Sequence, residues 1–243
     1  METYYNIKHS AGYGGVKRLA EHVDNPEGWL STQPTYTLHK PIKRKFPTRK
    51  YTTSAIDDLW QMDLMEMIPY ARINKGNRYI LTCIDVFSRF ARAVALKSKE
   101  AIELRNAIKV MLKDTTPRHI QTDMGKEFYN KLVRELIQSK KIIHYSVYSQ
   151  FKASLVERFN RTLREKFNRY FTHTGKKIWY NVLPDIINAY NNSKHRGIFS
   201  MKPAEVTKVN EMELWEKQQE VTGFLIKPTY KLLDYVLDGR SHF

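Results

Sequence analysis

Three acidic residues, Asp63, Asp123 and Glu157, lie in sequence contexts that favour a catalytic metal site. Asp63 lies inside an apolar segment, where a carboxylate is costly without a partner or a metal ion. Asp123 ends a predicted strand, at the edge where α/β sheets bind ligands, and Glu157 opens a predicted helix. Because a single Asp or Glu is usually a solvated surface charge, the combination of the three contexts carries the prediction.

These three carboxylates predict chemistry at phosphorus. Carboxylates that converge repel one another, and a divalent cation keeps all of them ionised at neutral pH. Oxygen ligands without clustered Cys or His favour Mg²⁺ or Mn²⁺ over Zn²⁺. Two such ions about 4 Å apart stabilise both the attacking and the leaving oxygen of an in-line displacement.

The overall charge favours a nucleic-acid partner. The 243 residues include 41 Lys and Arg against 25 Asp and Glu, and the resulting net charge of +16 attracts a polyanion. The single cysteine, Cys83, excludes a disulfide framework and a Cys-rich zinc module, so we expect an intracellular protein with Cys83 buried in a strand. No apolar run approaches the length of a membrane span, so we expect no membrane partner.

The elements that position the carboxylates predict an α/β fold with the order βββ-α-β-α-β-α. Three closely spaced strands predict an antiparallel meander, and strands separated by helices usually pair in parallel. The strands are expected at 59–67, 78–87, 89–96, 119–123 and 142–149. The helices between the later strands are expected at 99–113 and 130–141.

A long helix predicted at 152–170 places Glu157 beside basic residues. Glu157, Asn160, Arg161 and Arg164 are spaced so that they share one face of this helix. Apolar residues form the opposite face, which we expect to pack on the sheet. They are Val156, Phe159, Leu163, Phe167 and Tyr170. A further helix is expected at 178–191.

Four segments resemble the motifs of the DDE integrase core of retroviruses, retrotransposons and Polinton/Maverick DNA transposons. They are WQMDLMEM, ILTCIDVFSRF, IQTDMGKEFYN and SLVERFNRTL. The likeness is closest to Polinton-type integrases, through YTLHKP, KGNRYILT and KASLVERFNRTLR, and covers about residues 10–207. Between Asp123 and Glu157 lie 33 residues, close to the family's usual gap of about 35, so the metal-site roles transfer to the three carboxylates.

This resemblance implies an RNase H-like fold and Mg²⁺- or Mn²⁺-dependent cutting and joining of double-stranded DNA. Water first frees a 3′-hydroxyl near the end of a mobile element, and this hydroxyl then attacks target DNA. Arg161 and Arg164 match the family's basic positions after the glutamate, which contact the element's DNA end. Gln150 and Lys152, in the loop before the helix, are further expected DNA contacts. A homo-oligomer located in the nucleus is also implied.

The catalytic core is expected at 56–207, between smaller segments. Residues 1–39 predict a small helical unit for DNA binding or docking, and 208–243 predict a C-terminal helix and tail or a truncated remnant. A basic linker at 40–55 either contacts phosphates, directs nuclear import or forms a solvated spacer. Its clustered basic residues include Lys43, Arg44 and Lys45.

Two alternatives to an integrase stay open at this point. The chain is then either a non-catalytic DNA-binding remnant or captured integrase, or an RNase H-like nuclease that only hydrolyses.

Two further acids, Asp85 and Glu127, also have two interpretations each. Asp85 is a fourth member of the metal site or, as we favour, a structural hydrogen-bond acceptor. Glu127 pairs with a helix start, as we favour, or lies near the site.

Overall fold

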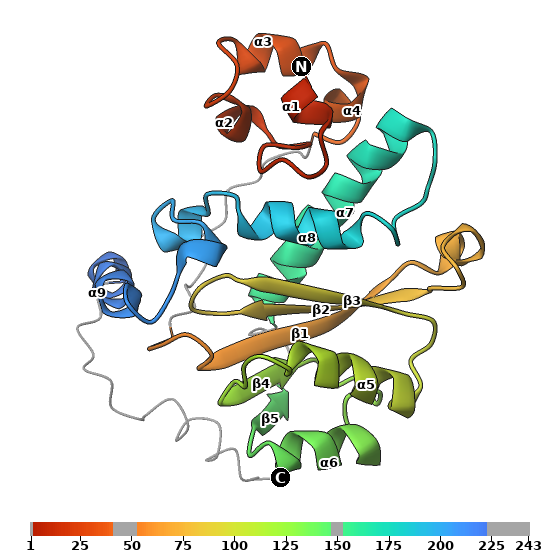
Figure 1. The fold of residues 1–243 in the computed structure, drawn as a ribbon, viewed down its shortest axis with the longest axis vertical. Helices are drawn as coiled ribbons and strands as arrows, with labels where there is room; N and C mark the ends of the chain where they lie inside the picture. The colour runs from red at the N-terminus through yellow and green to blue at the C-terminus, as the bar shows by residue number, and fades with distance from the viewer. Residues whose placement is uncertain (1, 41–52, 147–152, 223–243) are drawn as a thin grey trace, which may run out of the picture.

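A mixed five-stranded sheet forms the centre of the protein (Figure 1). The computed structural model describes residues 2–40, 53–146 and 153–222. The strand order is β3-β2-β1-β4-β5, with antiparallel pairing from β3 to β1 and parallel pairing from β1 to β5. This confirms the predicted meander with two parallel strands. The strands are β1 Leu59–Glu66, β2 Tyr79–Asp85, β3 Ala91–Leu96, β4 His119–Thr122 and β5 Ile143–Ser146.

Helices cover both faces of the sheet. The helices α5 (Ala101–Met111) and α6 (Lys131–Ser139) cover one face, and α7 (Ser154–Thr174) and α8 (Leu183–Asn191) cover the other (Figure 1). Because successive side chains of a strand point to opposite faces, β2 contributes to two cores. Ile80 packs against α7 and α8. Cys83, which is fully buried as predicted, belongs to the core on the side of α5 and α6.

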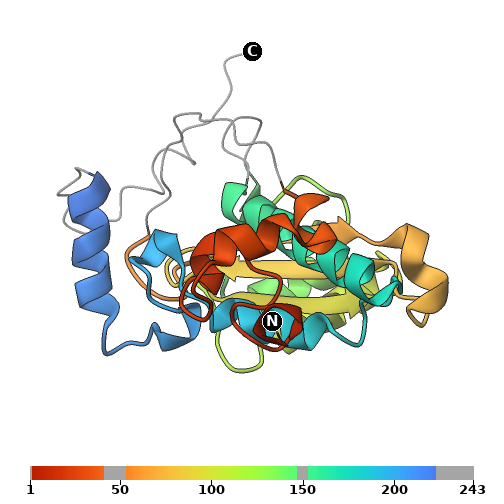
Figure 2. The ribbon, with the colours of Figure 1, turned by 90° about the horizontal axis from the view of Figure 1, so that it is seen from above.

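The N-terminal region, described at residues 2–40, contains four short helices. They are α1 Glu2–Tyr5, α2 Val16–Leu19, α3 Pro26–Ser31 and α4 Pro34–Thr37. They surround a small core that includes Tyr4, Tyr13, Leu19 and Leu30. This unit lies on the side of α7 and α8, and α4 contacts α7 (Figures 1 and 2).

The helix α8 begins at Leu183, five residues later than the sequence pattern predicts. Pro184 lies in its first turn, and the preceding backbone is held elsewhere. Asn74 Oδ1 accepts hydrogen bonds from the backbone N–H groups of Trp179 and Tyr180, at 2.7 and 3.1 Å. A long-range side-chain contact therefore replaces the expected first turn of this helix.

The β1–β2 connection contains a 3₁₀ helix, η1 (Ile68–Ile73), followed by a turn in which Lys75 and Gly76 both have positive φ. Beyond α8 come η3 (Arg196–Ile198), η4 (Pro203–Glu205) and α9 (Glu211–Thr222). Among the described residues, no helix is both long and apolar enough to cross a membrane.

Candidate active site

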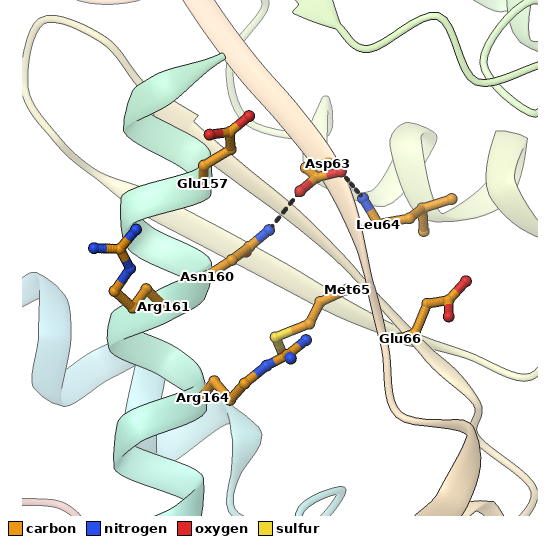
Figure 3. A pocket seen from close by; sticks show the side chains of 8 residues that line it. All are labelled: Asp63, Leu64, Met65, Glu66, Glu157, Asn160, Arg161 and Arg164. Atoms are coloured by element: carbon orange, nitrogen blue, oxygen red, sulfur yellow. Dashed lines mark hydrogen bonds between the residues drawn. The ribbon is translucent and has the colours of Figure 1, made fainter. Parts of the chain in front are cut away.

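Asp63 lies in the interior of β1, on the strand face that α7 covers. Its partner in the register of the sheet is Thr82 of β2. Asp63 Oδ2 accepts a hydrogen bond from Asn160 Nδ2 at 2.7 Å, and its Oδ1 accepts one from the Leu64 N–H at 2.8 Å (Figure 3). Both oxygens of this half-buried carboxylate are thus oriented, one of them from α7.

An open pocket of about 460 Å³ lies between β1 and the first half of α7. Its lining confirms the predicted shared face of the helix. Arg164 points across the pocket toward β1, whereas Arg161 extends outward from the helix (Figure 3). The pocket is lined by Asp63, Leu64, Met65, Glu66, Glu157, Asn160, Arg161 and Arg164.

Asp123 follows β4, the strand that pairs in parallel with β1. Its Oδ1 accepts a hydrogen bond from the Gly125 N–H at 3.1 Å. The hydroxyl groups of Thr122 and Ser146 both donate to the backbone carbonyl of Asp123, each at 2.8 Å. Tyr129 OH in turn contacts Ser146 Oγ, so β5 and the segment before α6 hold this turn in place. Asp123 is not part of the pocket lining.

Electrostatics connect the three acids. Burial raises the pKa of Asp63, and the negative charges of Asp123 and Glu157 raise it further. The hydrogen bonds from the Leu64 N–H and from Asn160 act in the opposite direction, because they stabilise the ionised form. Asp123 and Glu157 therefore lie close enough to Asp63 for their charges to affect it.

The donor set fits Mg²⁺ or Mn²⁺ by its chemistry. Asp63 and Glu157 line one pocket, Asp123 acts on Asp63 through its charge, and all three offer the oxygen ligands that these cations prefer. Within residues 2–40, 53–146 and 153–222, no group of three His, Cys, Asp or Glu residues is already arranged to hold a metal ion. The side chains as they lie thus supply the ligand type without a closed coordination sphere.

Asp85 has the structural role that the sequence analysis favours. It is buried, with 1% of its surface exposed, and lies opposite Trp60 rather than beside Asp63. It accepts hydrogen bonds from the backbone N–H groups of Ser88 and Asp57, at 2.8 and 3.3 Å, and from the Ser88 hydroxyl. These donors, from the β2–β3 turn and from the segment before β1, satisfy the carboxylate.

Glu127 has neighbours on two sides. It forms an ion pair of 3.4 Å with Lys99, two residues before the start of α5 at Ala101. A Cβ atom placed on Gly125 would lie 2.8 Å from Glu127 Cδ and 3.0 Å from Asp123 Oδ1, so the two carboxylates are near neighbours. The cap of α6 comes instead from Asn130, whose Oδ1 accepts from the Val133 N–H at 2.9 Å.

Five of the predicted DNA contacts lie outside the described residues. They are Lys43, Arg44, Lys45, Gln150 and Lys152.

Asn160 is a functional residue that the sequence analysis did not identify. The helical spacing places it only as a neighbour of Glu157. The spacing does not reveal that it reaches Asp63, because that contact depends on how α7 crosses β1.

Part of the chain is similar to integrases and transposon-derived proteins. The integrase core domain family matches residues 54–147, a range that includes Asp63 and Asp123 and ends before Glu157. A putative uncharacterized transposon-derived protein of Caenorhabditis elegans is 38% identical over 142 residues, which are 58% of this chain and 49% of that protein. The Gag-Pol polyprotein of Koala retrovirus is 28% identical over 152 residues, 60% of this chain and 9% of the polyprotein.

These matches support a member of the DDE integrase superfamily. The chain spans about half the length of the worm relative and less than a tenth of the viral polyprotein. A chain of a simian T-cell lymphotropic virus intasome has a similar fold, with a TM-score of 0.53 and 19% identity, over 74% of this chain and 65% of that one. The predicted RNase H-like fold is therefore confirmed for this chain.

Proposed function

We propose that this protein is a DNA integrase or transposase of a mobile element, which processes 3′ ends and transfers strands by in-line displacement at phosphorus. One observation carries the proposal. Asp63 of β1 and Glu157 of α7 line the same pocket as Arg161 and Arg164, and Asp123 directly follows β4, the strand that pairs in parallel with β1. A polyanionic substrate and cationic cofactors fit this combination of charges.

In this mechanism Asp63, Asp123 and Glu157 would hold Mg²⁺ or Mn²⁺, which supplies Lewis acidity and activates water as a nucleophile. Asn160 keeps the Asp63 carboxylate oriented through its 2.7 Å hydrogen bond. Arg164, which points across the pocket, and Arg161 bind DNA phosphates, since a guanidinium donates two parallel hydrogen bonds to phosphate oxygens.

The proposed substrates are the double-stranded ends of the element and its target DNA, and the net charge of +16 supports them. Two ends must be joined to one target, which supports a homo-oligomer as the working form. Because such a reaction takes place on chromosomal DNA, we also propose a nuclear location.

Oligonucleotide cleavage in the presence of Mg²⁺ tests the proposal. We expect Asp123→Asn to lower the cleavage rate by at least about 100-fold, because it removes a charged ligand of the cation. Asp114→Asn is the matched control, since Asp114 is exposed after α5 and does not line the pocket. Equal rates for wild type and Asp123→Asn would overturn the mechanism.

The reaction products separate the proposal from its two alternatives. Strand-transfer products identify an integrase, whereas cleavage without strand transfer identifies a nuclease that only hydrolyses. Salt-sensitive DNA binding without metal-dependent turnover identifies a non-catalytic remnant.

A further inference from the structure

Two buried glutamines connect the elements that carry the three acids. Gln61 of β1 is fully buried, and Gln121 of β4 is 1% exposed. The parallel register of β1 and β4 places them opposite each other, and Gln61 Nε2 donates to Gln121 Oε1 at 2.8 Å. Buried amides are costly unless they are hydrogen-bonded, so this pair depends on its partners.

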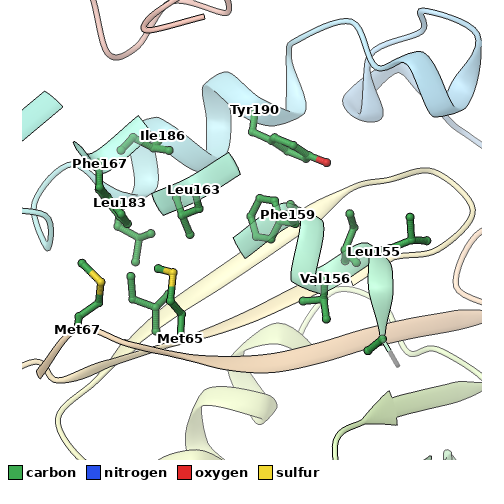
Figure 4. Packing of buried hydrophobic residues seen from close by; sticks show 14 of the residues in the cluster. Met65, Met67, Leu155, Val156, Phe159, Leu163, Phe167, Leu183, Ile186 and Tyr190 are labelled. Carbon is green, nitrogen blue, oxygen red and sulfur yellow. The ribbon is translucent and has the colours of Figure 1, made fainter. Parts of the chain in front are cut away.

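Gln61 also binds the start of α7. Its Oε1 accepts hydrogen bonds from the backbone N–H groups of Leu155 and Val156, at 3.0 and 3.2 Å. The first N–H groups of a helix have no partner within the helix, and the N-cap residue Ala153 provides no side-chain bond. Gln61 therefore caps α7 from a neighbouring strand. Figure 4 shows Leu155 and Val156 at this end of the helix.

The glutamine pair connects three segments. In each segment, one of the three acids follows within two residues. Asp63 follows Gln61 by two residues on the same strand face, Asp123 follows Gln121 by two, and Glu157 directly follows Val156. The contact thus fixes β1, β4 and the start of α7 relative to one another at the level of the carboxylates.

We infer that Gln61, paired with Gln121, is a positioning residue that holds Asp63, Asp123 and Glu157 in register for a divalent cation. This inference rests on the proposed function. If the hydrogen bonds to Gln61 are lost, the first turn of α7 loses its anchor on β1. Glu157 then moves relative to Asp63, and cation binding weakens, although the DNA-binding arginines stay on the same helix.

Three variants test the role of Gln61. Gln61→Met keeps the length of the side chain but removes the acceptor, whereas Gln61→Glu keeps an acceptor for the α7 N–H groups. Asn74→Leu is the matched control, since Asn74 is 1% exposed, accepts from two backbone N–H groups and does not line the pocket.

Calorimetric titration with Mn²⁺ and steady-state cleavage provide the first readouts. We expect Gln61→Met to weaken Mn²⁺ binding and lower kcat by about 10- to 100-fold, the usual effect of residues that orient metal ligands, with an unchanged Kd for DNA. Gln61→Glu should retain most of the wild-type Mn²⁺ affinity and kcat, and Asn74→Leu should keep the wild-type Mn²⁺ affinity.

Amide hydrogen exchange of the metal-free protein provides a readout that is independent of activity. Gln61→Met should lose protection at Leu155 and Val156, and Gln61→Glu should retain it. If Gln61→Met does not fold, Gln121→Met replaces it, because it removes the hydrogen bond that orients the Gln61 amide, so protection at Leu155 and Val156 should fall in part. Wild-type protection in a folded Gln121→Met variant would overturn the role of the pair.

The possible failures are distinguishable. An active wild type together with a folded Gln61→Met variant of wild-type Mn²⁺ affinity would overturn the role of Gln61 alone. A wild type that neither binds Mn²⁺ nor cleaves DNA would instead overturn the proposed function.

Discussion

The buried amine of Lys166 makes the free energy of unfolding of this protein depend on pH, and its lowered pKa determines the direction of that dependence. Lys166 on α7 is 3% exposed, and its Nζ donates to the backbone carbonyl of Gly12 at 2.9 Å. Arg169, one turn later, donates to the carbonyl of Tyr13 at 2.6 Å. These two bonds join the N-terminal unit to α7.

The size of the effect follows from the shift in the pKa of Lys166. Burial, together with the positive charges of Arg18 and Arg169, lowers this pKa from 10.5 to about 7. Between these two values the unfolded chain binds a proton that the native protein lacks, so the free energy of unfolding rises with pH. One proton contributes at most about 1.4 kcal/mol per pH unit, or about 2–3 kcal/mol over two units.

Urea unfolding of the wild type and of Lys166→Met, from about pH 7.5 to about pH 9.5, measures this effect. We expect the wild type to gain about 2–3 kcal/mol relative to the variant over this range. The comparison cancels opposing contributions from Cys83 and Tyr13, whose pKa values burial raises. Parallel pH profiles for the two proteins would refute the reasoning.

Two further predictions concern the pocket and the turn after β4. Arg161→Gln and Arg164→Gln should each reduce the slope of log K against log salt for DNA binding by about 0.9, as measured by fluorescence anisotropy. Lys109→Gln, on α5 across the sheet, should leave this slope unchanged. Gly125→Ala introduces a Cβ atom 2.8 Å from Glu127 Cδ and 3.0 Å from Asp123 Oδ1, so both side chains shift slightly and Mg²⁺-dependent cleavage should fall by about 10-fold. Normal cleavage by a folded Gly125→Ala variant would show that the position of Asp123 is not limiting.

The sequence by itself determined the elements whose patterns are local. Short strand-like runs separated by turns located β1 to β3, and apolar spacing of three and four residues located α7 with its buried face, including Phe159 and Leu163. Asp63 was identifiable because a carboxylate in an apolar strand is costly. The integrase motifs then connected these elements to one superfamily and one fold.

Only the tertiary structure decided which distant polar groups meet. Asn74 shortens α8 through bonds to residues more than 100 positions away, and Gln61 caps α7 across 94 positions. The contact between Asn160 and Asp63 likewise spans 97 positions. Such contacts leave no periodic pattern in the sequence, because they depend on how a helix lies across a strand rather than on the spacing of residues within either element.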